Sequence, residues 1–129
     1  MSGVIEVVGR TIWGAHESAG ETPYRVEYPM GGRRNEPREA FIAYERGAVV
    51  LYVHEDGRFG TGDLSADGRR ITTFCRRPGC DPRRCRKEHM VLSSGEALDK
   101  ACELTGQSTL DDVANVLLAH AQQRIDGSL

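Results

Sequence analysis

The sequence predicts an α+β fold in which an antiparallel β-meander is followed by a cysteine-rich knuckle and two C-terminal helices. Three observations predict it: apolar residues recur with period two over much of residues 1–74, cysteines crowd into residues 75–90, and a helical period begins after residue 91. A chain of 129 residues suits one domain that buries most of its apolar surface without disulfides. We therefore expect a single domain, 1–129.

The meander is expected to begin near the N-terminus. The side chains of residues 4–13 alternate with period two and predict a strand, one face of which carries Ile5, Val7, Gly9, Thr11 and Trp13. The segment from His16 to Thr22 is polar and predicts a turn.

The next segment, Tyr24 to Tyr28, alternates cleanly and predicts a half-buried strand with Tyr24, Val26 and Tyr28 toward the core. Pro29 to Arg38 holds two glycines, two prolines and three arginines, so it predicts a solvated loop that could alternatively reach a phosphate.

The remaining strands follow from β-rich runs separated by turn residues. The run AVVLYV is apolar on both faces, so it predicts the central strand of the sheet. Asp56-Gly57 and the Asp-Gly pair ending at Gly68 predict turns. The four expected strands are 39–45, 48–54, 58–62 and 69–74.

Two capping signatures predict the C-terminal helices. Ser93 precedes Glu96 by three residues and Gly106 ends the first helix, whose apolar side is expected to hold Leu98, Ala101, Cys102 and Thr105. Thr109 and Asp112 open the second helix. Its apolar stripe follows the i, i+3, i+4, i+7 series and comprises Leu110, Val113, Ala114, Leu117, Leu118, Ala121 and Ile125. This stripe is expected to be buried within one subunit or in a homodimer.

Between strands and helices lies the spacing Cys75-x4-Cys80-x4-Cys85-x3-His89. Three thiolates and an imidazole are the ligands of closed, four-coordinate structural Zn2+ sites. Pro78-Gly79 favours a type II turn between the first two cysteines. One turn of helix would place Cys85 and His89 on one face. The sequence therefore predicts a zinc knuckle.

This stretch resembles the CCCH-type zinc fingers, whose pattern also ends in cysteine, three residues and histidine. The resemblance covers Cys75 to His89. It implies a bound Zn2+ and, as in most members of that family, binding of single-stranded RNA through aromatic residues among the ligands; some members bind proteins. No aromatic lies between Cys75 and His89 here, and Phe74 flanks the motif.

Two alternatives concern the remaining cysteine and histidines. Cys102 could replace His89, giving an all-thiolate site and an iron–sulfur cluster. Its place in an apolar helical stripe favours a buried structural cysteine instead. His16, His54 and His120 are interpreted as structural residues.

The charge distribution points to a partner. Residues 69–90 carry eight basic and two acidic side chains, a net charge of +6, whereas residues 1–68 and 91–129 each carry −4. Because a zinc ion with three thiolates contributes only −1, the knuckle remains strongly basic. Such a patch suits the phosphates of a nucleic acid or an acidic protein surface. The basic residues within the knuckle are Arg76, Arg77, Arg83, Arg84, Arg86 and Lys87.

The sequence thus predicts a small, zinc-stabilised, regulatory protein that binds nucleic acid, DNA or RNA, through phosphate contacts. The alternative is a protein-interaction module for a host or assembly partner. The catalytic motifs of metalloproteases, α/β-hydrolases, P-loop NTPases and zinc deaminases are absent, so catalysis is not expected. Without an apolar leader or an 18-residue apolar run, a cytoplasmic protein without membrane contact is expected. The 15 arginines against two lysines indicate a GC-rich bacterial or phage genome.

Overall fold

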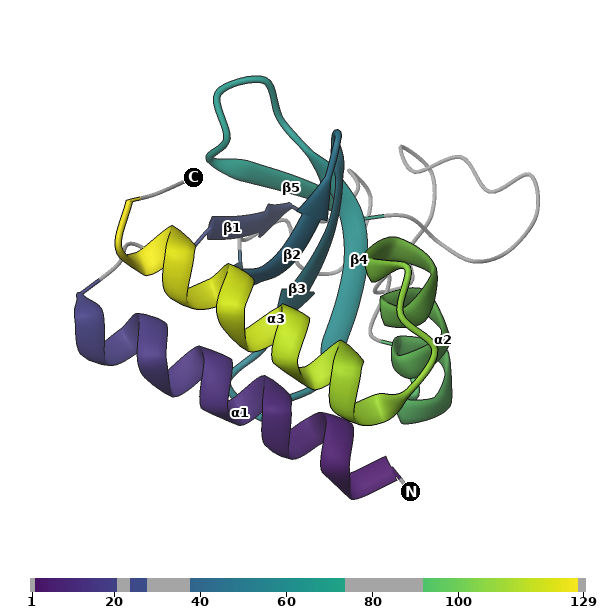
Figure 1. Ribbon diagram of the computed structural model, residues 1–129. Helices are drawn as coiled ribbons and strands as arrows, with labels where there is room; N and C mark the ends of the chain where they lie inside the picture. The colour runs from purple at the N-terminus through teal and green to yellow at the C-terminus, as the bar shows by residue number, and fades with distance from the viewer. Residues whose placement is uncertain (1, 21–23, 28–37, 74–91, 128–129) are drawn as a thin grey trace, which may run out of the picture.

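The computed structural model describes residues 2–20, 24–27, 38–73 and 92–127. Within these residues the fold is α+β, with helices packed against a curled sheet (Figure 1). The elements in chain order are α1 (Ser2–Ala19), β1 (Tyr24–Glu27), β2 (Arg38–Arg46), β3 (Val49–Val53), β4 (Phe59–Leu64), β5 (Arg70–Thr73), α2 (Ser94–Thr105) and α3 (Leu110–Ile125).

The five strands form a closed barrel in the order β1-β2-β3-β4-β5. Each consecutive pair is antiparallel, so β1 and β5 run in the same direction. The barrel can therefore close only through a parallel pair, and Arg25, Val26 and Glu27 of β1 do pair in parallel with Arg70, Ile71 and Thr72 of β5. A consequence is that β1 and β5 end at the same end of the barrel.

Strands β2 and β3 are apolar on both faces because each face packs against a different cluster. One set of side chains fills the inside of the barrel: Ala40, Ile42, Val50, Tyr52 and Ile71, with Leu64 against them. We call this set the barrel cluster. The alternate residues Phe41, Leu51 and Val53 point outward to the helices. The strand predicted from AVVLYV is confirmed as β3, which lies between β2 and β4 and is buried from Val50 to Val53.

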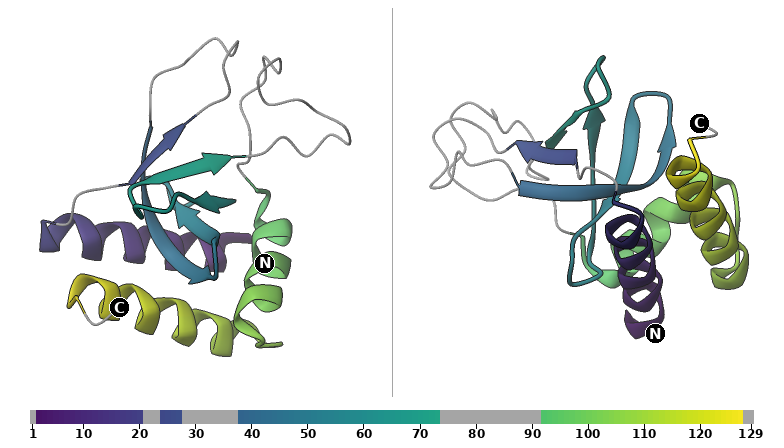
Figure 2. Two further views of the ribbon diagram at one scale, coloured as in Figure 1. Left: turned by 90° about the horizontal axis from the view of Figure 1, so that it is seen from above. Right: turned by 90° about the vertical axis from the view of Figure 1, so that its left-hand side faces the viewer.

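The outward face belongs to a larger helix-side cluster, in which residues of β2, β3 and β4 pack against all three helices. Figure 2 shows α1 and α3 lying side by side along the barrel, with α2 across one end of the pair. The fully buried members include Ile12, Leu51, Val113 and Leu117. This layer fixes the helices to the outside of the barrel.

The N-terminal strand predicted for residues 4–13 is wrong, because these residues form α1. Their β-branched side chains fit a strand period and a helical period about equally. The helical period prevails because Ile5, Val8 and Ile12 bury one stripe, whereas Val7, assigned to the same strand face as Ile5, is 51% exposed. The turn predicted from His16 is also wrong at its start, because α1 continues to Ala19 and buries His16.

The later strands and both C-terminal helices are confirmed with boundaries shifted by a few residues. Ser93 and Glu96 form the complete capping box of α2, and Gly106 ends that helix with φ of 73°. The Thr109 side chain accepts a hydrogen bond from the Asp112 N–H at 3.2 Å. The stripe predicted for α2 is wrong except at Ala101, because the buried residues are Ala97, Ala101 and Leu104 while Leu98, Cys102 and Thr105 are only partly buried. In α3 the buried stripe is narrower than predicted and comprises Val113, Leu117 and Ala121.

Two glycines allow α1 to approach the connection between β3 and β4. A Cβ on Gly9 would lie 2.2 Å from the carbonyl oxygen of Gly57, and one on Gly57 would lie 2.3 Å from the carbonyl oxygen of Glu6. Gly57 also has φ of 85°, which disfavours any side chain. This contact explains a glycine in the middle of a helix, where it otherwise costs stability.

Replacing Gly9 with Ala is therefore expected to destabilise the protein. The helical propensity of alanine favours the change by about 0.5–1 kcal/mol, but separating two backbones costs about 1–3 kcal/mol or more. Gly14 in the same helix is the matched control, because nothing lies within 4 Å of its added Cβ. Gly14→Ala should raise the denaturation midpoint and Gly9→Ala should lower it. Equal stabilisation by both would contradict the packing described.

Candidate metal and nucleic-acid site

All of the predicted zinc ligands, Cys75, Cys80, Cys85 and His89, lie outside the described residues. So do the basic residues predicted to contact phosphates, Arg76, Arg77, Arg83, Arg84, Arg86 and Lys87. Of the loop predicted from Pro29 to Arg38, residues 29–37 lie outside the described range, and Arg38 begins β2. The structure does describe the chain on both sides of residues 74–91. The site is therefore considered from the positions at which these segments join the barrel.

The N-terminal attachment of residues 74–91 is the end of β5. Thr73 pairs with Gly62 of β4, and Thr72 pairs both with Asp63 of β4 and with Glu27 of β1. The strand preceding the segment is therefore hydrogen-bonded on both sides, and Thr73 has a fixed place in the barrel.

The C-terminal attachment is Leu92, whose N–H donates to the Phe59 carbonyl at 2.8 Å. The His54 N–H donates a hydrogen bond to the carbonyl of Arg58, so this carbonyl points toward β3. Because carbonyls alternate along a strand, that of Phe59 points to the opposite edge of β4, which β5 occupies further along. Leu92 thus binds β4 along the same edge that β5 occupies. Its side chain is buried in the helix-side cluster.

Both attachments lie on β4, at Phe59 and Gly62. Three residues of a strand span about 10 Å. The entry and exit of residues 74–91 are thus held close together on one strand.

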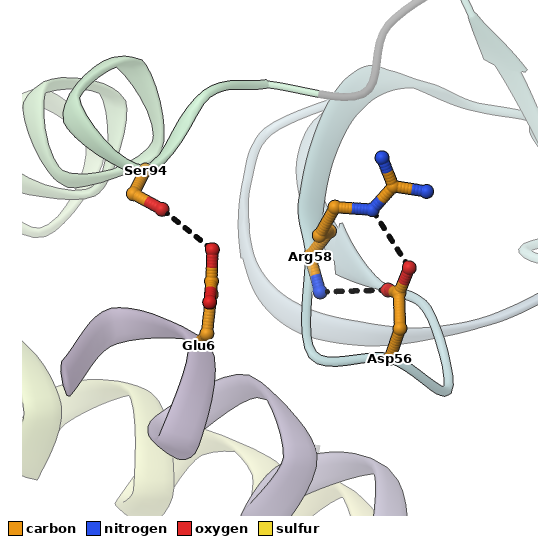
Figure 3. Close-up of polar contacts among 4 residues, drawn as sticks. All are labelled: Glu6, Asp56, Arg58 and Ser94. Carbon is orange, nitrogen blue, oxygen red and sulfur yellow. Dashed lines mark hydrogen bonds and ion pairs between the residues drawn. The ribbon is translucent and has the colours of Figure 1, made fainter. Parts of the chain in front are cut away.

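A second contact fixes the exit to α1. The Ser94 hydroxyl donates to the Glu6 carboxylate at 2.8 Å, joining the first residue of α2 to α1 (Figure 3). Nearby, on the connection between β3 and β4, the Asp56 carboxylate accepts hydrogen bonds from the Arg58 backbone at 3.0 Å and from its guanidinium Nε at 2.7 Å. Partial burial raises the pKa of Asp56, but the hydrogen bonds and charge of Arg58 outweigh it and lower that pKa overall.

The parallel pair of β1 and β5 brings two arginine-containing segments to one end of the barrel. Residues 28–37 follow β1, and residues 74–91 follow β5. Since Glu27 is paired with Thr72, the strand ends from which the two segments continue lie next to each other. The turns at Gly47 and at Ser65 to Arg69 lie at the opposite end.

Among the described residues there is no group of three or more histidine, cysteine or acidic side chains able to hold a metal ion. Cys102, the cysteine within the described range, is half-buried in α2 and packs against the helix-side cluster. It lies eight residues beyond Ser94, about 12 Å along the helix axis. This position favours the structural interpretation of Cys102 over its alternative as a metal ligand.

The described parts of the chain contain no helix that is both long enough and apolar enough to cross a bilayer. No protein-family model, curated protein or solved structure matches this chain.

Proposed function

We propose that this protein binds nucleic acid through a basic loop organised by one zinc ion. The observation that carries the proposal is the coincidence, within residues 75–89, of four ligands at zinc-finger spacing and six basic side chains in an otherwise acidic chain. We propose Cys75, Cys80, Cys85 and His89 as the zinc ligands.

The chemistry of the donor set suits zinc. Thiolate and imidazole ligands form closed tetrahedral sites, in which zinc orders a loop and has no free position for a catalytic water. Such a site with three thiolates carries a charge of about −1, far less than the opposite charge of the loop's arginines and lysine. The surplus positive charge supports an anionic partner.

The attachments on β4 are compatible with this role. A loop whose ends are held about 10 Å apart by hydrogen-bonded strand positions has already lost part of its conformational entropy. A metal crosslink inside such a loop has less entropy to overcome when it orders the remaining residues. The barrel then serves as a rigid base for the basic loop.

The shared end of β1 and β5 supports a binding surface built from two segments. Arg33 and Arg34 belong to the segment that follows β1, beside the start of the cysteine-containing segment. Guanidinium groups bind phosphate oxygens in bidentate fashion, so these two arginines would extend the contacts along a nucleic-acid backbone.

Phosphate contacts predict a particular kind of binding. Since no aromatic lies between Cys75 and His89, base stacking contributes little, and duplex should compete at least as well as single strands. Phosphate contacts carry no sequence information, so the affinity should depend weakly on base sequence. Counterion release should make it fall steeply with salt.

A salt titration with a charge-reversed loop tests the proposal. For duplex DNA, each phosphate contact contributes about 0.9 to the slope of log K against log salt concentration, so Arg83→Glu with Arg84→Glu should lower that slope by about two. Fluorescence anisotropy of a labelled duplex measures both the affinity and the slope. The zinc content should not change, since neither arginine is a proposed ligand.

The matched control is Arg46→Glu with Arg69→Glu. It changes the net charge equally, at exposed positions at the opposite end of the barrel. The control should keep most of the affinity and the slope. Equal losses in both double variants would show that the net charge, and not the loop, attracts the nucleic acid. No binding to DNA or RNA at low salt by folded, zinc-loaded protein would favour an acidic protein partner.

A further inference from the structure

The C-terminal half of α1 buries an imidazole that has no hydrogen-bond partner in the part of the chain that the structure describes. His16 is 1% exposed, and neither ring nitrogen has a hydrogen-bond partner among the described residues. Its ring stacks on Phe41 of β2 with centroids 4.7 Å apart and planes at 16°. Trp13 meets the same phenyl ring edge-on at 4.5 Å. His16 thus occupies an aromatic site between α1 and β2 that favours a neutral ring.

Helix α3 supplies the charged groups near this site. Arg124 forms an ion pair with Glu45 of β2, and His120 Nε2 lies 3.8 Å from the same carboxylate, beyond hydrogen-bonding distance. The His120 ring packs on Tyr44 with centroids 4.8 Å apart, and its Nε2 has no hydrogen-bond partner among the described residues. On α1 itself, Glu17 is exposed and accepts a hydrogen bond from the Trp13 indole at 3.3 Å. Two poorly partnered imidazoles and one guanidinium therefore meet where α1, α3 and β2 join.

This junction opposes protonation of both histidines. Burial above all, and then the charges of Arg124 and His120, lower the pKa of His16 to about 4 from 6.5. Burial also lowers the pKa of His120. A proton on His16 would be enclosed beside Arg124 in surroundings of low polarity, whereas a proton on His120 would also face the Glu45 carboxylate 3.8 Å away.

We propose that His16 and His120 form an acid-sensitive latch that holds the C-terminal halves of α1 and α3 against β2 at neutral pH and releases them on acidification. An aliphatic side chain at position 16 would continue the stripe of Ile5, Val8 and Ile12 without leaving two polar atoms unpaired. Within the described residues the imidazole gains ring stacking but no hydrogen bond for either nitrogen, and such a departure from the rule that buried polar groups are paired points to a functional role.

The direction of the effect follows from the two pKa values of His16. In the closed state α1 and α3 are packed on β2 and the pKa of His16 is about 4; in the open state their ends are released and that pKa is the ordinary 6.5. The open state therefore binds more protons than the closed state between pH 6.5 and 4. The closed state is thus favoured above pH 6.5 and is lost progressively as the pH falls toward 4. Between pH 7 and 5 the shift of His16 changes the opening equilibrium about twenty-fold. Burial raises the pKa of Glu45, so protonation of this carboxylate favours the closed state as the pH falls through that raised pKa and offsets part of the effect of His16.

Hydrogen exchange at pH 7 and 5, corrected for intrinsic exchange rates, tests the latch. Protection at the C-terminal ends of α1 and α3 should fall about twenty-fold, while that of β3 stays unchanged. His16→Leu should remove most of this loss. An NMR titration of the unmodified protein gives an independent reading if that variant does not fold. In the closed state the His16 ring should remain neutral at pH 5.

Four results would overturn the latch. Simultaneous loss of protection in β3 and both helices would show acid unfolding of the whole protein. Unchanged protection down to pH 5, or an NMR titration of His16 near pH 6.5 in the closed state, would show that the junction tolerates a proton. An unaltered acid response in His16→Leu would remove His16 from the mechanism.

Discussion

Replacing Leu117 with Asp is expected to unfold the protein at neutral pH. Leu117 has no exposed surface and lies in the helix-side cluster beside the barrel. Removing a buried leucine costs about 2–5 kcal/mol, and enclosing an unpaired carboxylate costs several kcal/mol more. Their total approaches the whole folding free energy of a typical domain, about 5–15 kcal/mol. The residue packs within its own subunit, so the loss requires no partner copy.

The neighbouring residue provides the matched control. Leu118 is 37% exposed, so Leu118→Asp should cost at most about 1 kcal/mol, mainly in helix propensity and partial burial. Circular dichroism and thermal melting of both variants measure the difference. A cooperative melt of Leu117→Asp at the wild-type temperature would show that this face of α3 is not packed as described.

The elements predicted correctly are those with a local signal of their own. The hydrogen bonds between Ser93 and Glu96 and the left-handed Gly106 depend on residues a few positions apart, so the ends of α2 can be read from the sequence. Strand β2 was predicted from its β-rich composition, and β3 because its short run is apolar on both faces. Barrel closure could not be predicted, because the pairing of β1 with β5 joins residues about 45 positions apart.

The N-terminal helix was missed because its sequence is ambiguous between two periods. Its β-branched residues favour a strand, and Gly9 weakens a helix prediction. The reason for Gly9 is its contact with Gly57, which is nearly 50 residues away in the chain. A signal for the helix was present in the spacing of Ile5, Val8, Ile12 and His16. A histidine in the fourth position weakens that signal because it does not count as apolar, although this one is buried.

The candidate site was predicted from the types and spacing of its ligands and from the basic residues among them. The structure adds where this segment joins the barrel. The spacing of the cysteines says nothing about where the loop joins the fold. The attachment of Thr73 and Leu92 to the same strand, and the neighbouring starts of residues 28–37 and 74–91, follow from strand pairing over long distances in the chain. No local motif in the sequence predicts the junction that His16 and His120 form.

Loss of the proposed zinc ion is the other change with a large expected effect. Structural zinc in finger peptides contributes roughly 10–16 kcal/mol of binding free energy at neutral pH, and this energy orders the loop around the ion. Cys80→Ser should therefore abolish tight zinc binding and disorder the basic loop. The barrel cluster and the helix-side cluster have their own packing, so most secondary structure should remain in the circular dichroism spectrum.

Cys102→Ser is the matched control, since it makes the same substitution at the remaining cysteine. Cys102 packs in the helix layer, about 12 Å along α2 from Ser94, so its serine variant should keep the metal. Loss of metal in Cys102→Ser, with retention in His89→Ala, would establish the all-thiolate alternative. Loss in His89→Ala alone would support three cysteines and one histidine as the ligands.

The metal content of the purified protein tests the central claim most directly. Elemental analysis combined with native mass spectrometry should find about one zinc ion per chain in the wild type and in Cys102→Ser. Cys80→Ser should contain little or none. Folded wild-type protein without zinc, or a brown protein that contains iron and sulfide, would contradict the claim that a zinc ion organises the basic loop.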